Sequence, residues 1–388
     1  MKQPRILFLV VIVLLPLVLL SCSGTAQLKG GWSGPAVYDG IIYVGTRDGR
    51  VVALNSSAVT SNASNQRALW EWPDTAGARS LIYTTPAVKG ELVYVGTYDG
   101  RIYAVTVARG VERWVYPRTG SIGGIIGSPV MGNETMYISS SDGRVYALDT
   151  TYGDLKWKSD PLAVKLWTSP AVTGDTLYVS TLDGHIYALS RETGKLLEWS
   201  FESQAGFASA PVVGEGIIYA GSFDNNLYAI RIDDGELLWK FRGGKWFWAA
   251  PLVSEGVVYA ACLDGRVYAL DAESGEELWP QPFESKDQKG KPAAIVASPV
   301  LIGNLLIVAN EAGNVYIVNS KTGDGERIRN RENGDKPTIN AQIRAPLCAH
   351  EGILYIRGED NRLYAVDIET MKVSEPIPLS EESEGATQ

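Results

Sequence analysis

The chain has 388 residues, of which 45% are hydrophobic, enough for one large or two ordinary globular domains. Its 44 acidic residues outnumber its 35 basic residues, which gives a formal net charge of −9. Because a nucleic-acid-binding protein needs a basic face to displace counterions, this charge argues against a nucleic-acid partner.

The first residues have the pattern of an export signal. Lys2 and Arg5 precede an unbroken apolar run from Ile6 to Leu20. A transmembrane helix needs about 20 residues, so this run is too short to span a bilayer, and we predict a signal peptide over residues 1–21. Its removal takes away two basic residues and no acidic one, which leaves 33 basic and 44 acidic residues and a formal charge of −11.

The end of the signal carries a cysteine. The letters LLSC, which end at Cys22, resemble the lipobox of bacterial lipoproteins, in which the cysteine becomes the first residue and carries the lipid. We therefore predict that Cys22 is lipidated and that residues 22–31 form a membrane tether. The protein would then be exported and held at the outer face of a cell membrane, or at the periplasmic face of an outer membrane if the cell has one. The alternative is an ordinary signal peptide with an incidental cysteine.

From residue 32 to residue 379 the chain repeats one pattern. A proline opens each unit, and successive prolines are 40 to 51 residues apart. These prolines are Pro35, Pro86, Pro129, Pro170, Pro211, Pro251, Pro299 and Pro346. A period near 40 to 45 residues is typical of a β-propeller with one four-stranded blade per repeat. We therefore predict an all-β fold over residues 32–379, a monomeric eight-bladed propeller of four-stranded antiparallel blades.

Each unit reads as four short strands, which we name A to D. The fourth unit contains SPAV, TLYVS, HIYAL and LLEWSF, separated by turn residues such as Asp183-Gly184. An Asp-Gly pair between alternating apolar residues is a strong hairpin signal. A calcium loop would instead need several oxygen ligands at alternate positions, and these turns lack them. In the seventh unit Ala312 stands in place of the turn aspartate.

Aromatic residues recur in the same register. A tyrosine occupies one place in strand B and another in strand C, and a tryptophan stands near the end of strand D. The tryptophans are Trp114, Trp157, Trp199, Trp239 and Trp279, with Trp70 and Trp72 in the first unit. Large rings against small neighbours allow one twisted sheet to pack on the next, so we interpret this ladder as structural rather than as a set of ligand platforms.

The repeat also carries a family resemblance. The stretches YALDAESGEELW (Tyr268–Trp279) and YALSRETGKLLEW (Tyr187–Trp199) resemble the tryptophan-docking repeat of the pyrroloquinoline-quinone propellers. The resemblance covers nearly the whole mature chain and implies an eight-bladed ring. Together with a lipid anchor, the pattern is similar to that of the outer-membrane assembly lipoproteins of this superfamily. It implies that the partners are other envelope proteins.

Residues for redox or hydrolytic chemistry are missing from the pattern. Quinoprotein dehydrogenases, by the same resemblance, stack the quinone on a disulfide between adjacent cysteines, near calcium and a catalytic aspartate. The cysteines here are Cys22, Cys262 and Cys348, and none are adjacent. The two histidines, His185 and His350, are too few for a metal cluster. We predict no catalytic residue, no cofactor, no metal and no enzymatic activity.

The connections that vary indicate where a partner would bind. Hairpin order places the B–C turns and the crossings from strand D to the next strand A at one end of the ring. Aromatic and basic residues gather at these D–A crossings. They are Trp32, Tyr83, Trp167, Trp246 and Trp248, with Lys165, Lys245 and Arg344. Either these side chains plug the channel, or they form a docking site for a peptide edge or small ligand.

The carboxyl-terminal end closes the pattern. The segment Lys372–Leu379 is expected to supply the outer strand of the eighth blade, and residues 380–388 to form a disordered acidic tail. The function that these features favour is a membrane-anchored extracytoplasmic scaffold for protein–protein interaction in envelope or outer-membrane assembly. A quinoprotein-like redox or sensor module and a polysaccharide-binding surface protein are the alternatives.

Overall fold

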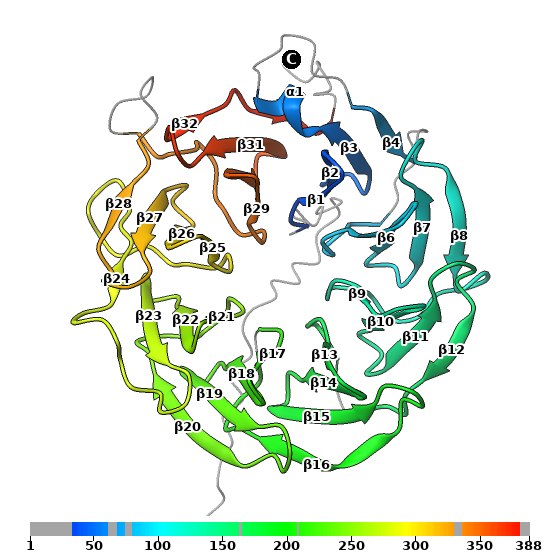
Figure 1. Ribbon diagram of the computed structural model, residues 1–388. Helices are drawn as coiled ribbons and strands as arrows, with labels where there is room; N and C mark the ends of the chain where they lie inside the picture. The colour runs from blue at the N-terminus through cyan, green and yellow to red at the C-terminus, as the bar shows by residue number, and fades with distance from the viewer. Residues whose placement is uncertain are drawn as a thin grey trace, which may run out of the picture.

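The computed structural model describes residues 33–60, 68–73, 80–162, 165–207, 209–329 and 336–380. Within these residues the strands form eight antiparallel sheets arranged as a closed ring (Figure 1). Each sheet uses strands that are consecutive in the sequence, so each is one blade. This confirms the predicted eight-bladed propeller. The described part of the chain holds no helix that is long and apolar enough to cross a membrane.

The first four blades run from Ala36 to Glu202. Blade 1 has β1 (Ala36–Tyr38), β2 (Ile41–Gly45), β3 (Val51–Asn55) and β4 (Trp70–Trp72), with the short helix α1 (Ser56–Thr60) after β3. Blade 2 has β5 (Ala87–Lys89), β6 (Leu92–Gly96), β7 (Ile102–Thr106) and β8 (Glu112–Tyr116). Blade 3 has β9 (Val130–Met131), β10 (Thr135–Ser139), β11 (Val145–Asp149) and β12 (Leu155–Lys158). Blade 4 has β13 (Ala171–Thr173), β14 (Thr176–Ser180), β15 (His185–Ser190) and β16 (Leu196–Glu202).

The other four blades complete the ring. Blade 5 has β17 (Val212–Gly214), β18 (Ile217–Gly221), β19 (Asn226–Arg231) and β20 (Leu237–Arg242). Blade 6 has β21 (Leu252–Ser254), β22 (Val257–Ala261), β23 (Arg266–Asp271) and β24 (Phe283–Glu284). Blade 7 has β25 (Val300–Ile302), β26 (Leu305–Ala309), β27 (Val315–Asn319) and β28 (Gly325–Arg327). Blade 8 has β29 (Cys348–His350), β30 (Ile353–Arg357), β31 (Arg362–Asp367), β32 (Lys372–Val373) and β33 (Ile377–Pro378).

The recurring aromatic residues line up across each sheet. In blade 2, Tyr94 of β6 is opposite Ala104 of β7, which is opposite Trp114 of β8. Because alanine is small, the two rings meet above it, with centroids 5.9 Å apart. The register of the repeat therefore sets up one aromatic pair on one face of the blade.

This pair then docks on the next blade. Trp114 Nε1 and the Tyr94 hydroxyl both donate to the backbone oxygen of Thr150 in blade 3, each at 3.1 Å. Gly153 lies flat against the Trp114 ring, with a φ of +72°. Six blades have the tryptophan part of this dock, with Nε1–oxygen distances of 2.7 to 3.1 Å, in the pairs Trp70–Gly110, Trp114–Gly153, Trp157–Gly194, Trp199–Gly235, Trp239–Gly275 and Trp279–Gly323. The structural interpretation of the tryptophan ladder is thus confirmed.

The B–C turns are hydrogen-bonded hairpins. Gly184 follows Asp183 with a φ of +97°, a conformation that glycine adopts without strain. Turn aspartates also accept bonds from tyrosines of strand C, as in blade 3, where the Tyr146 hydroxyl lies 2.6 Å from Asp142. That carboxylate and burial together raise the pKa of Tyr146. The turn aspartates therefore hold their own hairpins, as the sequence predicted.

Apolar packing joins every pair of neighbouring blades, including the last and the first. Eight clusters of buried residues fill these interfaces. Between blades 8 and 1, Val59 of α1 packs with Ile377 and Leu379. Both β32 and β33 pair with β31, so the expected outer strand of blade 8 is present in two pieces, which flank Pro376. In the described residues the ring therefore closes by side-chain packing, because blades 1 and 8 share no strand.

Candidate binding face at the D–A crossings

The D–A crossings and the B–C turns lie on one face of the ring, as predicted. Backbone hydrogen bonds join the two kinds of connection. The amide of Tyr98 donates to Leu81 at 3.0 Å, and the amide of Leu263 donates to Trp246 at 3.0 Å. We call this side of the propeller the D–A face.

The crossings into blades 2 to 7 share one buried position. The residue four places before the blade's proline is fully buried under the blade interface; examples are Ile82, Leu166 and Phe247, all 0% exposed. In blade 8 the buried position is one place later, at Ile343. Successive side chains of an extended segment point in opposite directions. The next residue therefore points away from the core. This is the position of Tyr83, Trp167 and Trp248.

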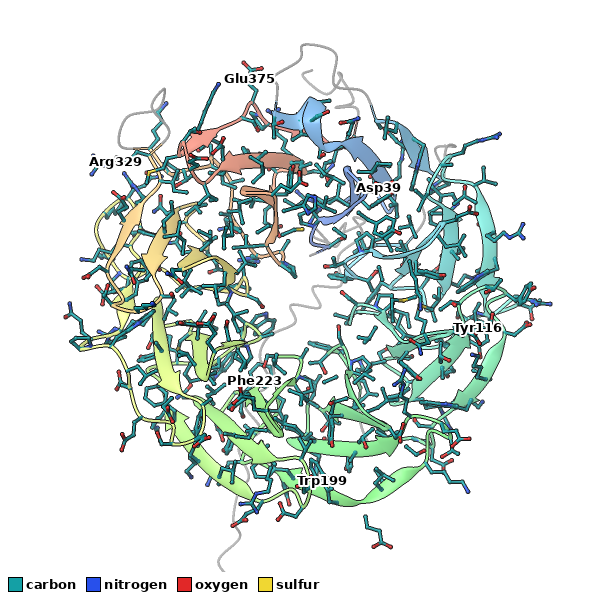
Figure 2. All side chains as sticks on the ribbon, in the orientation of Figure 1. Asp39, Tyr116, Trp199, Phe223, Arg329 and Glu375 are labelled. Carbon is teal, nitrogen blue, oxygen red and sulfur yellow. The ribbon has the colours of Figure 1, made fainter. Side chains whose placement is uncertain are left out.

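Three aromatic rings meet at the crossing from blade 5 to blade 6. The Phe223 ring centroid lies 5.0 Å from that of Trp246 and 5.9 Å from that of Trp248. Phe223 is on the inner side of the ring in Figure 2. Lys245, beside Trp246, is exposed. We call Phe223, Trp246, Trp248 and Lys245 the aromatic cluster.

Backbone and thiol contacts hold this cluster in place. The Lys245 carbonyl accepts a bond from Cys262 Sγ at 3.2 Å, and the Trp246 carbonyl accepts the Leu263 amide. Burial raises the pKa of the Cys262 thiol to about 12, so this thiol stays protonated and is not a nucleophile. The thiol therefore contributes packing and a hydrogen bond to the cluster.

The other predicted site residues lie apart from this cluster. Tyr83 instead pairs with Tyr98, with centroids 5.4 Å apart, and burial raises the pKa of Tyr83. Trp167 is 38% exposed, and Lys165 close by in the chain is also exposed. Arg344 forms an ion pair with Glu311, at 2.9 Å between Nε and a carboxylate oxygen. Trp32 and Cys22 lie outside the described residues.

Two aromatic residues of this face were not predicted from the sequence. Phe223 and Tyr98 stand directly before the turn aspartates Asp224 and Asp99. The same place holds Arg47, Ser141, Leu182, Leu263, Glu311 and Glu359 in the other units. This position varies while the rest of the turn is fixed. Such variation was the available sequence signal, because it is typical of a surface that binds a partner and not of the core.

The aromatic cluster is rich in residue types that protein interfaces use. Trp246 and its neighbours offer aromatic surface, and tryptophan is enriched among interface hot spots. Cys262 and Cys348 are free thiols. Within the described ranges, no group of three or more His, Cys, Asp or Glu residues could hold a metal ion.

Blade number, tryptophan docks and repeat motif together define a pyrroloquinoline-quinone-like repeat β-propeller. The profile of the family described as outer membrane protein assembly factor BamB matches residues 22–197 and 196–383. The chain therefore belongs to this family.

Solved structures share the fold. BamB from Moraxella catarrhalis is 19% identical, with a TM-score of 0.67 over 86% of this chain and 93% of that chain. The computationally designed Ika8 protein is 18% identical, with a TM-score of 0.69 over 87% of this chain and 96% of that chain. At such identities the likeness concerns the fold. No curated protein matches this chain.

Proposed function

We propose that this protein is a lipid-anchored scaffold that binds envelope proteins during outer-membrane assembly and does so without catalysis. The observation that carries the proposal is the aromatic cluster on the D–A face of a propeller that belongs to the assembly-factor family. Among the described residues of the other crossings, no three partly exposed aromatic rings meet in this way, so the repeat alone does not require the cluster.

The chemistry of the cluster favours a protein partner. Tryptophan is enriched among interface hot spots, the residues whose replacement by alanine lowers affinity most. Tyr83 with Tyr98, and Trp167, add aromatic surface on the same face. An extended segment or loop of a partner would lie across these rings, with its backbone and apolar side chains against them.

Anchoring and location complete the proposal. Lipidation at Cys22 would hold the propeller at a membrane, at the periplasmic face of an outer membrane where one exists. More than one acyl chain gives stable attachment, whereas a single chain holds only marginally. The propeller would act there as a monomer and present the D–A face to its partners.

The test replaces Trp246→Ala together with Lys245→Ala and measures capture of envelope proteins from solubilised membranes. A matched pair of substitutions, Tyr152→Ala with Lys195→Ala, changes an aromatic residue that is 66% exposed and an exposed lysine on the opposite face. We expect the first pair to weaken capture by tenfold or more and the second to leave it unchanged, since hot-spot truncations cost about 2 kcal/mol or more.

Thermal unfolding separates loss of binding from loss of structure. The Trp246 and Lys245 double variant should melt within a few degrees of the parent, because changes away from the core shift stability by about ±0.5 kcal/mol. Normal capture by this variant would refute the docking site. Early unfolding would show that the aromatic rings are a structural plug.

A further inference from the structure

The crossing from blade 6 to blade 7 carries a small cationic hairpin. The Asp287 amide donates to the Lys291 carbonyl at 2.7 Å, and the Asp287 carboxylate accepts the amides of Lys289 and Lys291 at 2.8 and 2.9 Å. The side chains of Lys286, Lys289 and Lys291 are exposed. The only carboxylate within residues 286–291 therefore caps its own turn. All three ammonium groups are at the surface, and that of Lys286 lies 3.9 Å from a carboxylate oxygen of Glu284.

The base of this hairpin is held by buried polar groups. The Lys286 carbonyl accepts bonds from the Tyr316 hydroxyl at 2.8 Å, Asn310 Nδ2 at 3.1 Å and Asn314 Nδ2 at 2.7 Å. Asn310 and Asn314 are 0% exposed. The lysines are therefore presented by a rigid support rather than by a loose loop.

The missing turn aspartate of blade 7 makes this support possible. In blade 6 the Tyr268 hydroxyl is bound by the turn carboxylate of Asp264 at 2.7 Å. Ala312 has no carboxylate, so Tyr316 is available to bind the hairpin at Lys286 instead. The same exchange removes one negative charge from the surface beside the lysines.

Two turns on the opposite face of the ring are acidic. The C–D turn of blade 6, residues 271–277, holds four acidic and no basic residues. In blade 5, Arg231 is the one cation of residues 231–236, and it pairs with both Asp234 at 2.9 Å and Glu236 at 2.6 Å. The hairpin is thus a cationic site on a chain that is acidic overall, and these two turns of the far side are acidic.

The chain leaves the ring on the same side as the hairpin. Ser33, the first described residue, accepts a bond from the Gly45 amide at 3.0 Å, at the end of β2 that leads into a B–C turn. Blade 8 alone separates blade 7 from blade 1 in the ring (Figure 1). The ten residues 22–31 reach at most about 35 Å, so a lipid on Cys22 would keep this sector of the D–A face near the bilayer.

We infer that the Lys286–Lys291 hairpin docks on anionic lipid headgroups of the membrane that holds the tether. Blades 7, 8 and 1 then face the membrane, and the aromatic cluster between blades 5 and 6 stays available to a protein partner. The inference uses the proposed tether only for proximity, and the experiment supplies an artificial tether in its place.

The expected effect follows from the charges. A basic residue near an anionic bilayer contributes about 1 kcal/mol, or roughly a fivefold factor. Residues 286–291 hold three lysines and one aspartate, a net charge of +2, so they favour the hairpin-down orientation by about twenty-fivefold. The acidic turns of blades 5 and 6 oppose the inverted orientation. Salt at about 1 M, where the Debye length is about 3 Å, should abolish this preference.

The experiment measures orientation on vesicles. The chain from residue 23 onward keeps every blade, and an amino-terminal histidine tag attaches it to phosphatidylcholine vesicles with a nickel-chelating lipid and about a third phosphatidylglycerol. In a Cys348→Ser background, a dye is placed at Gln288→Cys, an exposed neutral position of the hairpin, or on the far face at Glu273→Cys, and quenching by a headgroup quencher is recorded. We expect at least twofold stronger quenching at residue 288, lost at high salt and lost without phosphatidylglycerol.

Matched charge changes locate the effect. Lys286→Gln with Lys291→Gln should lower the quenching at residue 288, whereas Lys195→Gln with Lys372→Gln, an equal charge change on the far face, should not. Equal quenching at both dye positions, or quenching that ignores phosphatidylglycerol, overturns the inference. If the hairpin pair instead weakens capture of envelope proteins and leaves quenching intact, the hairpin binds an acidic protein. The variant with Trp246→Ala and Lys245→Ala should keep the normal orientation on vesicles. The orientation experiment therefore tests the hairpin independently of the proposed docking site for proteins.

Discussion

Substitution of Gly275 by alanine tests whether the tryptophan docks hold the ring together. A Cβ atom at Gly275 would lie 2.6 Å from Cδ2 of Trp239, so the ring would have to move. Gly216 provides the control, because its φ of +79° is close to the +74° of Gly275, and no atom lies within 4 Å of the Cβ position. Both substitutions place an alanine in the left-handed region of backbone conformation. Only the one at Gly275 also brings a Cβ atom against a tryptophan ring.

The magnitudes follow from that difference. An alanine in the left-handed region costs about 1–2 kcal/mol, which is the whole effect expected for Gly216→Ala. Gly275→Ala should cost about 1–3 kcal/mol more, because it also forces an extra group against a packed ring. In a Trp239→Ala background the clash is gone, so Gly275→Ala should there cost no more than Gly216→Ala does.

Urea-unfolding midpoints of the four variants, followed by circular dichroism, give these differences. A coupling of about 1 kcal/mol or more between Gly275 and Trp239 would support the dock. Equal costs for Gly275→Ala and Gly216→Ala, with no coupling to Trp239, would refute the reasoning that the flat contact between blades stabilises the ring.

Three further predictions concern the anchor, the tyrosines and the cofactor. Cys22→Ala should move the protein from the membrane to the soluble fraction, and retention on membranes after a high-salt wash would contradict lipidation. Burial raises the pKa of Tyr43, Tyr219 and Tyr228 from 10 to about 12, so the stability that these neutral phenols confer is complete below pH 10 and is lost as the pH rises through 12. The urea midpoint should fall across that interval and stay level near neutral pH; a level midpoint up to pH 12 would be inconsistent with this cause. Purified protein given pyrroloquinoline quinone and calcium should oxidise no alcohol or sugar in a dye-linked assay, and turnover above the blank would show an enzyme.

The ring could be predicted from the sequence because its determinants are local and repeated. A turn aspartate such as Asp183, a strand B tyrosine such as Tyr178 and a tryptophan such as Trp199 recur at fixed distances, and each acts within its own blade or on the next one. Neighbouring blades are also neighbours in sequence. The register of one unit therefore predicts the packing of the six blades that carry the tryptophan.

The binding face was harder to predict, because its contacts join residues from different units. The sequence marks Trp246 as unusual, but only the fold brings Phe223 of the preceding turn to within 5.0 Å of it. Conversely, Arg344 looks like a free cation in the sequence, yet Glu311 of the adjacent turn neutralises it. Such pairings depend on how far each D–A crossing extends over the adjacent B–C turn. The periodicity of the sequence does not predict this distance.

The closure between blades 8 and 1 has a consequence for the order of folding. During synthesis the amino-terminal end emerges first, and each new blade can pack at once on the blade before it. Blade 1 is different, because the apolar residues Ile42, Val44 and Val52 on its free side pack against blade 8, the last blade to be made. Until Leu363 and Ile377 of blade 8 have been made, the incomplete propeller exposes this apolar side of blade 1. A chaperone or a second incomplete chain could bind there.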